Sequence, residues 1–219
     1  MGTVVLVHGA WHGAWCWQAV VRELEARGVK VVAVNLPLTS YADDVAAARA
    51  AIVAAGEGSV VCGHSYGGMV ISQGAADLPG VRRLVYLTAF QTDPGEDPIT
   101  LMQADPSPLM TAIRVGDSGL TVDPDRLHEV FYHDSDPAIA KEIAPKLRPM
   151  PFGDTWSSAT PAWKSVPSTY VICTQDRAIS AGVQRKMAQR ANDVVEWPTD
   201  HSPFLTRPAA VAELLHSYL

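Results

Sequence analysis

Cysteine is scarce in this sequence, and so are long apolar runs. The three cysteines among 219 residues stand at positions 16, 62 and 173. An odd number at such wide spacing predicts no disulfide framework, so Cys62 and Cys173 are interpreted as small core residues. No apolar run approaches the roughly 20 residues that span a bilayer, and no basic leader with a cleavage site precedes the first apolar run. These absences predict a cytoplasmic protein with no membrane association.

Positively charged residues are also few. Lysine and arginine number 17 against 23 acidic residues, which gives a net charge of −6 spread along the chain. A basic patch is the electrostatic footprint of a nucleic-acid-binding protein, so no nucleic-acid partner is expected. No pair of histidines has a metal-ligand spacing such as His-Glu-x-x-His, so no metal and no other cofactor is expected. The hydrophobic content of 47% is typical of a globular domain with a large core.

Strand and helix signals alternate along most of the chain. Short, apolar, β-branched runs predict strands, and longer segments with helical periodicity predict helices between them. The predicted strands are residues 3–8, 29–34, 59–62, 81–87, 169–173 and 194–197. The predicted helices of this pattern are residues 18–27, 41–55, 69–78, 180–191 and 208–219. This order predicts an α/β protein with a mostly parallel central sheet and helices on both faces.

The alternation breaks in the middle of the chain, where 11 of the 16 prolines lie between residues 94 and 167. Two short helices still fit, one opened by Asp123-Pro124 and ending at Tyr132, the other opened by Asp136-Pro137 and ending near Leu147. A structureless loop of this length is unusual in a compact domain. We therefore predict a small helical cap, residues 93–165, inserted into a core of residues 1–92 and 166–219.

The strongest functional signal is the run Val-Val-Cys-Gly-His-Ser-Tyr-Gly-Gly at residues 60–68. An apolar strand ends in Gly-x-Ser-x-Gly and a helical pattern follows, which predicts that Ser65 stands on a sharp strand-to-helix turn with its hydroxyl exposed. Gly63 and Gly67 fit a turn that leaves no room for larger neighbours. An ordinary turn serine is the alternative, but the glycine pattern favours a nucleophile.

Two downstream residues complete a catalytic arrangement. A serine hydroxyl is a poor nucleophile unless a base takes its proton and a third group orients that base. Asp176 follows the predicted strand 169–173, and His201 follows the predicted strand 194–197. Parallel sheets place their ligand crevice at these carboxyl ends, and the order Ser, Asp, His is that of the α/β-hydrolases. We predict Ser65 as nucleophile, His201 as general base and acid, and Asp176 as the orienting acid.

Alternatives to these assignments stay open at this stage. Asp93, just past the strand 81–87, is the main competing acid. Asp200 is a weaker competitor, because adjacent side chains point apart. Asp176 is alternatively a plain helix-start residue, and His201 a surface histidine.

The loop after the first strand, His8 to Trp17, is interpreted as a second part of the site. Acyl transfer develops negative charge on the carbonyl oxygen, and each backbone N–H group aimed at it contributes about 3 kcal/mol or more. One donor is expected to be the amide of Tyr66, the residue after the nucleophile, and the other to come from this loop. Gly9 allows a close backbone approach. For Trp11, two interpretations are kept: packing of the loop, or a place in the substrate pocket.

Five segments resemble the plant methylesterase and hydroxynitrile lyase branch of the α/β-hydrolases, and the chain is similar to a bacterial esterase of this branch. They are residues 5–17, 63–68, 131–134, 173–176 and 200–204. The resemblance implies an α/β-hydrolase fold, a triad of Ser65, Asp176 and His201, an oxyanion hole from the amides of Ala10 and Tyr66, and a small cap over an apolar pocket. Candidate pocket residues are Gly9, Trp11, Tyr132, Trp156 and Trp163, and packing is the alternative for the four aromatic ones.

The same resemblance separates two chemistries. The lyases of this branch carry a threonine after the first-loop histidine and a lysine after the catalytic histidine, where this chain has Gly9 and Ser202. Because the lysine supports the departing cyanide, its absence favours ester hydrolysis. We predict a carboxylic-ester hydrolase for small, largely apolar esters that acts through an acyl-enzyme. Alternatives are a hydroxynitrile lyase, a hydrolase of carbon–carbon bonds, or a non-enzymatic ligand receptor. The expected partner is a small-molecule ester, and a homodimer is a candidate assembly.

Overall fold

A parallel sheet organises the molecule and sets the position of every candidate site residue. The computed structural model describes residues 2–151 and 159–219, and within them six parallel strands form this sheet in the order β2-β1-β3-β4-β7-β8. The strands are β1 Thr3–Val7, β2 Lys30–Val34, β3 Ser59–Ser65, β4 Val81–Ala89, β7 Ser168–Cys173 and β8 Asp193–Trp197. The expected α/β-hydrolase fold, with its mostly parallel sheet, is confirmed.

Strand β1 shows why the central strands are continuous apolar runs. All five of its residues are buried, because helices cover both faces of the sheet. Successive side chains point to opposite faces, so Val4 and Leu6 join one apolar cluster while Val5 and Val7 join the other. The edge strands β2 and β8 are partly exposed.

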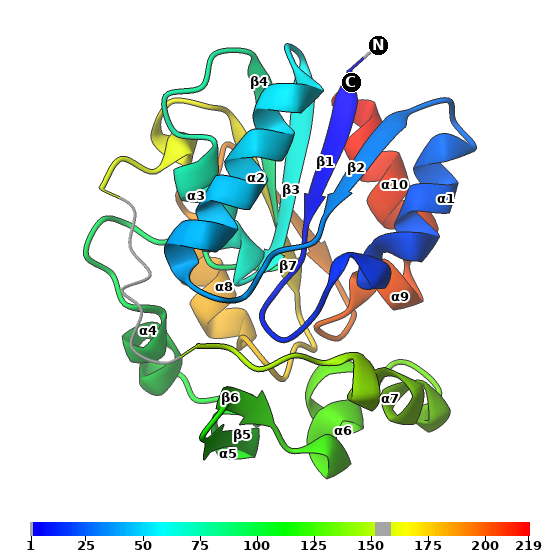
Figure 1. Ribbon diagram of the computed structural model, residues 1–219, viewed down its shortest axis with the longest axis vertical. Helices are drawn as coiled ribbons and strands as arrows, with labels where there is room; N and C mark the ends of the chain where they lie inside the picture. Colours follow the sequence, from blue (N-terminus) through cyan, green and yellow to red (C-terminus); the bar gives the residue numbers. More distant parts are fainter. Residues whose placement is uncertain (1, 152–158) are drawn as a thin grey trace.

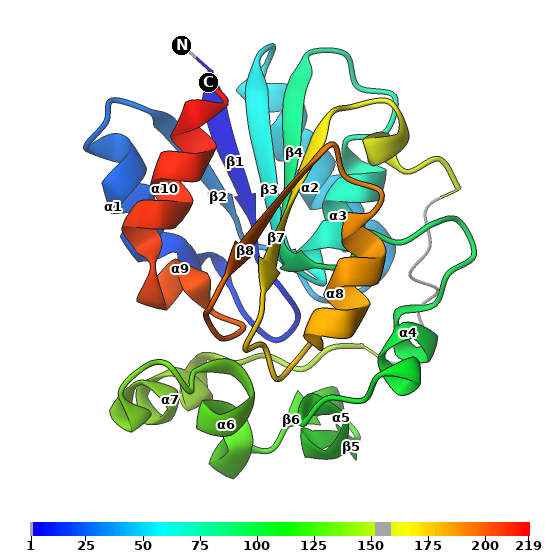
Figure 2. The same cartoon turned by 180° about the vertical axis from the view of Figure 1, so that it is seen from behind.

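Helices of the described residues cover both faces of the sheet (Figures 1 and 2). On one face lie α1 Gln18–Glu25, α9 Pro203–Thr206 and α10 Pro208–Ser217. On the other lie α2 Tyr41–Ala55, α3 Gly67–Gly74 and α8 Ala181–Ala188. Helix α2 has the predicted bounds, whereas α3 begins two residues earlier and ends four residues earlier than predicted, and α9 was not predicted. Strand β3 continues three residues beyond its predicted end, as far as Ser65 itself.

Most of the described residues between β4 and β7 form a separate layer beyond the carboxyl ends of the strands, at the bottom of Figure 1. We call residues 98–150 the cap layer. Its elements are α4 Pro98–Ala104, α5 Leu109–Ala112, the antiparallel pair β5 Ile113–Gly116 and β6 Gly119–Val122, α6 Leu127–Phe131 and α7 Pro137–Ile143. The boundaries predicted at residues 93 and 165 stay a prediction.

Both predicted Asp-Pro helix starts are present in the cap layer. The side chain of Asp123 accepts a hydrogen bond from a first-turn amide, and that of Asp136 does the same. Each predicted helix is shorter than expected, because a 3-10 turn at Pro124–Arg126 precedes α6 and another at Ala144–Lys146 follows α7. The β5–β6 hairpin and α4 were not predicted.

Candidate active site

Ser65 stands at the carboxyl end of β3, on the turn into α3. Its φ of 53° lies in the left-handed region, which costs a non-glycine residue roughly 1–2 kcal/mol. The Ser65 carbonyl accepts a hydrogen bond of 3.1 Å from the amide of Phe90, which ties the turn to the end of β4. The backbone is therefore held in a strained strand-to-helix elbow of the kind that the sequence motif predicts.

The glycines around Ser65 are required by close backbone packing. A Cβ atom on Gly63 would lie 2.6 Å from the carbonyl oxygen of Gly67, and one on Gly67 would lie 2.6 Å from the carbonyl oxygen of Val7. Real Cβ contacts are never this short, so α3 could not start this close to β1 and β3 with side chains at these positions. The motif is thus the sequence signature of a helix packed directly against the ends of two strands.

His201 and Asp176 form a buried pair just beyond β8 and β7. The Nδ1 atom of His201 lies 2.6 Å from Oδ2 of Asp176, and the two residues are 2% and 8% exposed. A carboxylate can only accept hydrogen bonds, so Nδ1 of His201 carries the ring proton and donates to Asp176. The other nitrogen, Nε2, is then unprotonated and is the basic nitrogen of His201. The other donors are the amides of Ala178 and Ile179, the hydroxyl of Thr88 and the side-chain amide of Gln184.

A second histidine places His201 beside the serine turn. The ring of His64 donates from Nε2 to the carbonyl oxygen of His201 at 2.8 Å, and the two ring centroids are 4.6 Å apart. His64 immediately precedes Ser65 in β3. The structure therefore brings the three predicted triad residues to one edge of the sheet.

The two competing acids have other partners. Asp93 is partly exposed, and Lys164 and Arg190 each place a nitrogen 3.2 Å from its carboxylate. Asp200 is buried, and its carboxylate accepts hydrogen bonds of 3.0 and 2.9 Å from two backbone amides, those of residues 134 and 202. Of the three candidate acids, Asp176 is the one bonded to the imidazole of His201.

A mostly apolar cavity opens in front of Ser65, between the sheet edge and the cap layer. The residues proposed for the oxyanion hole, Ala10 and Tyr66, line it together with Ser65. Its remaining walls are the side chains of Trp11, Met69, Phe90, Pro98, Ile99, Met102, Leu109, Ile113, Leu120, Met150 and Ile179. Most of these come from the cap layer, which therefore encloses the site.

Of the five candidate pocket residues, one lines this cavity and a second packs against Ser65 without lining it. Trp11 lines it directly. Gly9 lies behind Ser65, and a Cβ atom on Gly9 would come within 2.8 Å of the Ser65 Cβ, so only glycine lets the loop approach so closely.

The other candidates differ from the expectation. Tyr132 is fully buried and its hydroxyl lies 2.6 Å from Nε2 of His12, because a buried phenol needs a polar partner and finds it under the loop after β1. Trp163 donates from its indole N–H to the carbonyl of Thr92 at 3.2 Å, away from the described cavity walls. Trp156 lies outside the described residues.

The apolar cavity walls were missed at the sequence level. Side chains such as Met102, Leu109 and Met150 have the composition of ordinary core residues, and no spacing rule separates a cavity wall from a core contact. His12 was also missed, although it stands in a segment that was singled out for the oxyanion hole.

Three histidines around the site are buried as neutral rings. Burial lowers the pKa of His8 to about 3 and that of His12 to about 4, and it holds the pKa of His64 well below its ordinary value of 6.5. The hydrogen bonds of His8 fit a neutral ring, with Nδ1 donating to the Gly9 carbonyl and Nε2 accepting from the amide of Leu36.

These rings predict that the protein loses stability steeply in mild acid. A histidine whose pKa is lower in the folded state than in the unfolded state stabilises the fold at pH values above its unfolded-state pKa of 6.5. This stabilisation decreases as the pH falls from 6.5 toward the folded-state pKa. Each buried ring should lower the unfolding free energy by about 2 kcal/mol as the pH falls from 7 to 5. The carboxyl groups of Asp44 and Asp200, whose pKa values are raised by burial, offset part of this loss. Urea titrations at pH 7, 6 and 5 measure this.

The control for this prediction is ionic strength. Desolvation of buried rings is insensitive to salt, whereas surface charge repulsion is screened, so the pH slope should be the same with 0.5 M NaCl. An unfolding free energy that changes by less than about 1 kcal/mol from pH 7 to pH 5 would contradict the burial of three neutral histidines.

The described residues contain neither a membrane-spanning helix nor a cluster of metal ligands. Across residues 2–151 and 159–219, no helix is both long and apolar enough to cross a membrane. In the same ranges, no three His, Cys, Asp or Glu side chains come together in a group that could hold a metal ion.

A serine on a glycine-flanked elbow, at the carboxyl edge of a parallel sheet and beside a His–Asp pair, is the arrangement of an α/β-hydrolase. Residues 4–214 match the alpha/beta hydrolase family, and the chain belongs to this family. The family expected from the sequence motifs is thus confirmed.

Several relatives cover nearly the whole chain. The chain is similar to the pyrethroid hydrolase of Sphingobium wenxiniae, with 31% identity over 98% of this chain and 86% of that protein. It is also similar to methylesterase 2 of Arabidopsis thaliana, with 28% identity over 96% of this chain and 93% of that protein. A crystal structure of a pyrethroid hydrolase from Sphingobium faniae superimposes with a TM-score of 0.82 and 29% identity, over 99% of this chain and 96% of that chain.

Proposed function

We propose that this protein, an ester hydrolase by its family and its relatives, is a serine-dependent carboxylesterase for small, largely apolar esters. The observation that carries the proposal is the position of Ser65. It lines an apolar cavity, and its neighbour His64 donates a hydrogen bond to the carbonyl oxygen of His201, which lies against the same turn. Relatives that are named for pyrethroid and methyl ester hydrolysis support the same reaction class.

In the proposed mechanism, Ser65 Oγ attacks the ester carbonyl carbon while Nε2 of His201 accepts the hydroxyl proton. The imidazolium that forms is stabilised by Asp176 through Nδ1–H. The carbonyl oxygen becomes an oxyanion, which the backbone amides of Ala10 and Tyr66 stabilise. His201 then gives its proton to the leaving alcohol, and a water molecule releases the acyl group from Ser65 by the same sequence of steps.

The cavity walls favour uncharged substrates. None of the described residues that line the cavity carries a charge. A carboxylate or ammonium group on the substrate would lose its hydration there without gaining a partner, which costs several kcal/mol. An apolar acyl or alcohol group is instead stabilised by contact with side chains such as Met69 and Phe90.

The same walls argue against cyanohydrin cleavage. A departing cyanide needs a nearby cation, and neither Lys nor Arg is among the described lining residues. Ser202, which follows the proposed catalytic histidine, is fully buried, and its amide donates to Asp200. Ester hydrolysis is therefore the reaction that this site supports better.

The proposal is tested with a fluorophosphonate probe and a panel of p-nitrophenyl esters. We expect one probe molecule per protein, attached to Ser65, and many turnovers on the acetate and butyrate esters. A hemisuccinate ester of similar size, which carries a carboxylate, should be a much poorer substrate. A protein that leaves these esters intact and takes no label is not a serine esterase. Cleavage of mandelonitrile at a comparable rate would favour the lyase, and labelling without turnover would favour a ligand receptor.

A further inference from the structure

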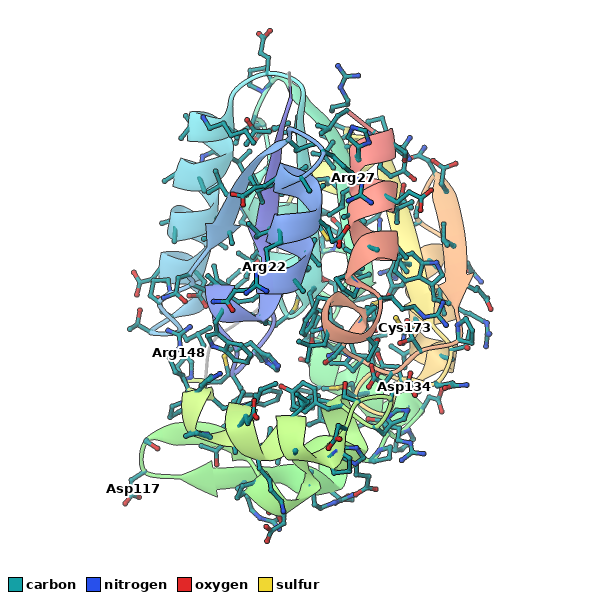
Figure 3. The ribbon with its side chains drawn as sticks, turned by 90° about the vertical axis from the view of Figure 1, so that its right-hand side faces the viewer. Arg22, Arg27, Asp117, Asp134, Arg148 and Cys173 are labelled. Atoms are coloured by element: carbon teal, nitrogen blue, oxygen red, sulfur yellow. The ribbon has the colours of Figure 1, made fainter. Side chains whose placement is uncertain are left out.

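The loop that follows β1 is held mainly by the cap layer. We call residues 8–13 the β1 loop. The Arg148 amide donates to the carbonyl of Trp11 at 2.8 Å, and the Arg148 side chain donates to the carbonyl of His12 at 2.8 Å. The indole N–H of Trp11 donates to the carbonyl of Leu120, in β6, at 2.9 Å. Figure 3 shows Arg148 at the level where the cap layer meets the core. The conformation of the β1 loop therefore depends on the cap layer.

Trp11 shows why this support matters. Its φ of 62° lies in the left-handed region, where a bulky residue costs roughly 1–2 kcal/mol. Such a conformation persists only where the surroundings over-determine it. The preceding residue, Ala10, carries one of the two amides proposed for the oxyanion hole, so a relaxed Trp11 backbone would move that donor.

The most buried link to the cap layer runs through His12. Its Nδ1 atom lies 2.7 Å from the carbonyl oxygen of Ala10, and its Nε2 atom lies 2.6 Å from the hydroxyl of Tyr132. Tyr132 is 0% exposed and His12 is 2% exposed, so neither bond can be exchanged freely for water.

The chemistry of these groups fixes the direction of both bonds. A carbonyl oxygen can only accept, so Nδ1 of His12 carries the proton and donates to Ala10. Burial lowers the pKa of His12 to about 4, so the ring is neutral at pH 7 and Nε2 is an acceptor. The Tyr132 hydroxyl must therefore be the donor. We call the residues Tyr132, His12 and Ala10, joined in this order, the tether.

We propose, on the basis of the esterase function above, that Tyr132 is a positioning residue for the oxyanion hole. Through the neutral His12 ring it fixes the Ala10 carbonyl, which belongs to the peptide that follows the Ala10 N–H. Holding this carbonyl restricts rotation of the Ala10 backbone, and so it restricts the direction in which the Ala10 N–H points at the tetrahedral intermediate. It does not touch the substrate, since it lies apart from the described cavity walls.

The outer end of the tether is itself fixed. Two residues beyond Tyr132, the amide of Asp134 donates to the carboxylate of Asp200 at 3.0 Å, and the amide of Asp200 donates to the carboxylate of Asp134 at 2.8 Å. The ring of Phe131 lies 5.6 Å from that of His201 and 5.6 Å from that of His12. The segment 131–134 thus contacts both His12, next to the proposed oxyanion hole, and His201, the proposed catalytic base.

The test compares Tyr132→Phe with Tyr86→Phe, which removes an equally buried hydroxyl that is hydrogen-bonded to Ser72 of α3 at 2.8 Å and has no bond to the β1 loop. Both variants should lose similar thermal stability. Oxyanion stabilisation acts only in the transition state, so Tyr132→Phe should lower kcat for a p-nitrophenyl ester about 10- to 50-fold with KM within about twofold. Tyr86→Phe should keep kcat within about twofold. Equal kcat values in the two variants would overturn the proposal.

A second pair of variants keeps the test independent of the tyrosine. In His12→Asn the side-chain amide occupies the place of Nδ1 and can still donate to Ala10, whereas His12→Leu cannot. We expect kcat of His12→Asn to exceed that of His12→Leu about tenfold, and equal values would contradict the tether. If the esterase function itself is wrong, the unmodified protein shows neither turnover nor labelling, which separates that failure from the failure of the tether.

Discussion

Ser65→Ala lowers kcat for p-nitrophenyl butyrate by about 10⁶-fold and abolishes labelling by the fluorophosphonate probe. The substitution removes the atom that forms the acyl-enzyme, and the residual rate comes only from binding and oxyanion stabilisation. The fold should be retained, because alanine removes a single oxygen from a residue that is 9% exposed. The measurement is initial rates at saturating substrate, with circular dichroism to compare the folds.

Ser59→Ala is the matched control for this substitution. Ser59 begins the same strand that Ser65 ends, and it is also buried. Its hydroxyl has no hydrogen-bond partner within residues 2–151 and 159–219, so alanine there removes a buried polar atom at no cost in hydrogen bonds. The control should keep full activity, and a Ser65→Ala protein that turns over esters within 100-fold of the unmodified rate would contradict the nucleophile assignment.

Asp176→Asn is expected to lower kcat about 10⁴-fold. The Oδ1 atom of Asp176 accepts from two backbone amides, so an asparagine would keep its oxygen there and turn its NH₂ group toward His201. Two donors would then face each other, and the His201 ring would move its proton to Nε2. That tautomer cannot accept the serine proton, so both ester turnover and the rate of fluorophosphonate labelling should decrease.

The control for the aspartate is Asp93→Asn. Asp93 also follows a strand of the sheet, but it is bound to Lys164 and Arg190 at the surface. We expect it to keep kcat within about twofold and to lose at most about 1 kcal/mol of unfolding free energy. If Asp93→Asn impairs turnover more than Asp176→Asn does, the orienting acid has been assigned to the wrong residue.

The two aspartates also show what the sequence could and could not predict. Both follow apolar strands, and chain order alone allows either to serve as the orienting acid. The choice depends on strand order, which places β7 next to β8 and thus Asp176 next to His201, while Asp93 lies past β4. Core strands were predictable because their apolar runs are buried on both faces, and Ser65 was predictable because the elbow admits only glycine around it.

The cap layer was predicted much less well, for a physical reason. Its elements are four to seven residues long, too short for a helical or alternating period to stand out. The hairpin of β5 and β6 turns between Gly116 and Gly119, and such glycine-rich stretches are typical of loops. Tyr132 of this layer, like Trp163 of the predicted cap, was a candidate for the pocket on residue type alone, with core packing as the alternative. Residue type does not encode which way a side chain in an irregular segment points.

The contacts between the cap layer and the β1 loop have a consequence for protein engineering. Exchanging caps between homologous hydrolases is an obvious way to exchange specificities, and it treats the insertion as a self-contained module. In this molecule the donor sequence would also need a hydroxyl at position 132 and an arginine at position 148, or else bring its own version of residues 8–13. The smallest portable unit is therefore the insertion together with the turn that follows the first strand.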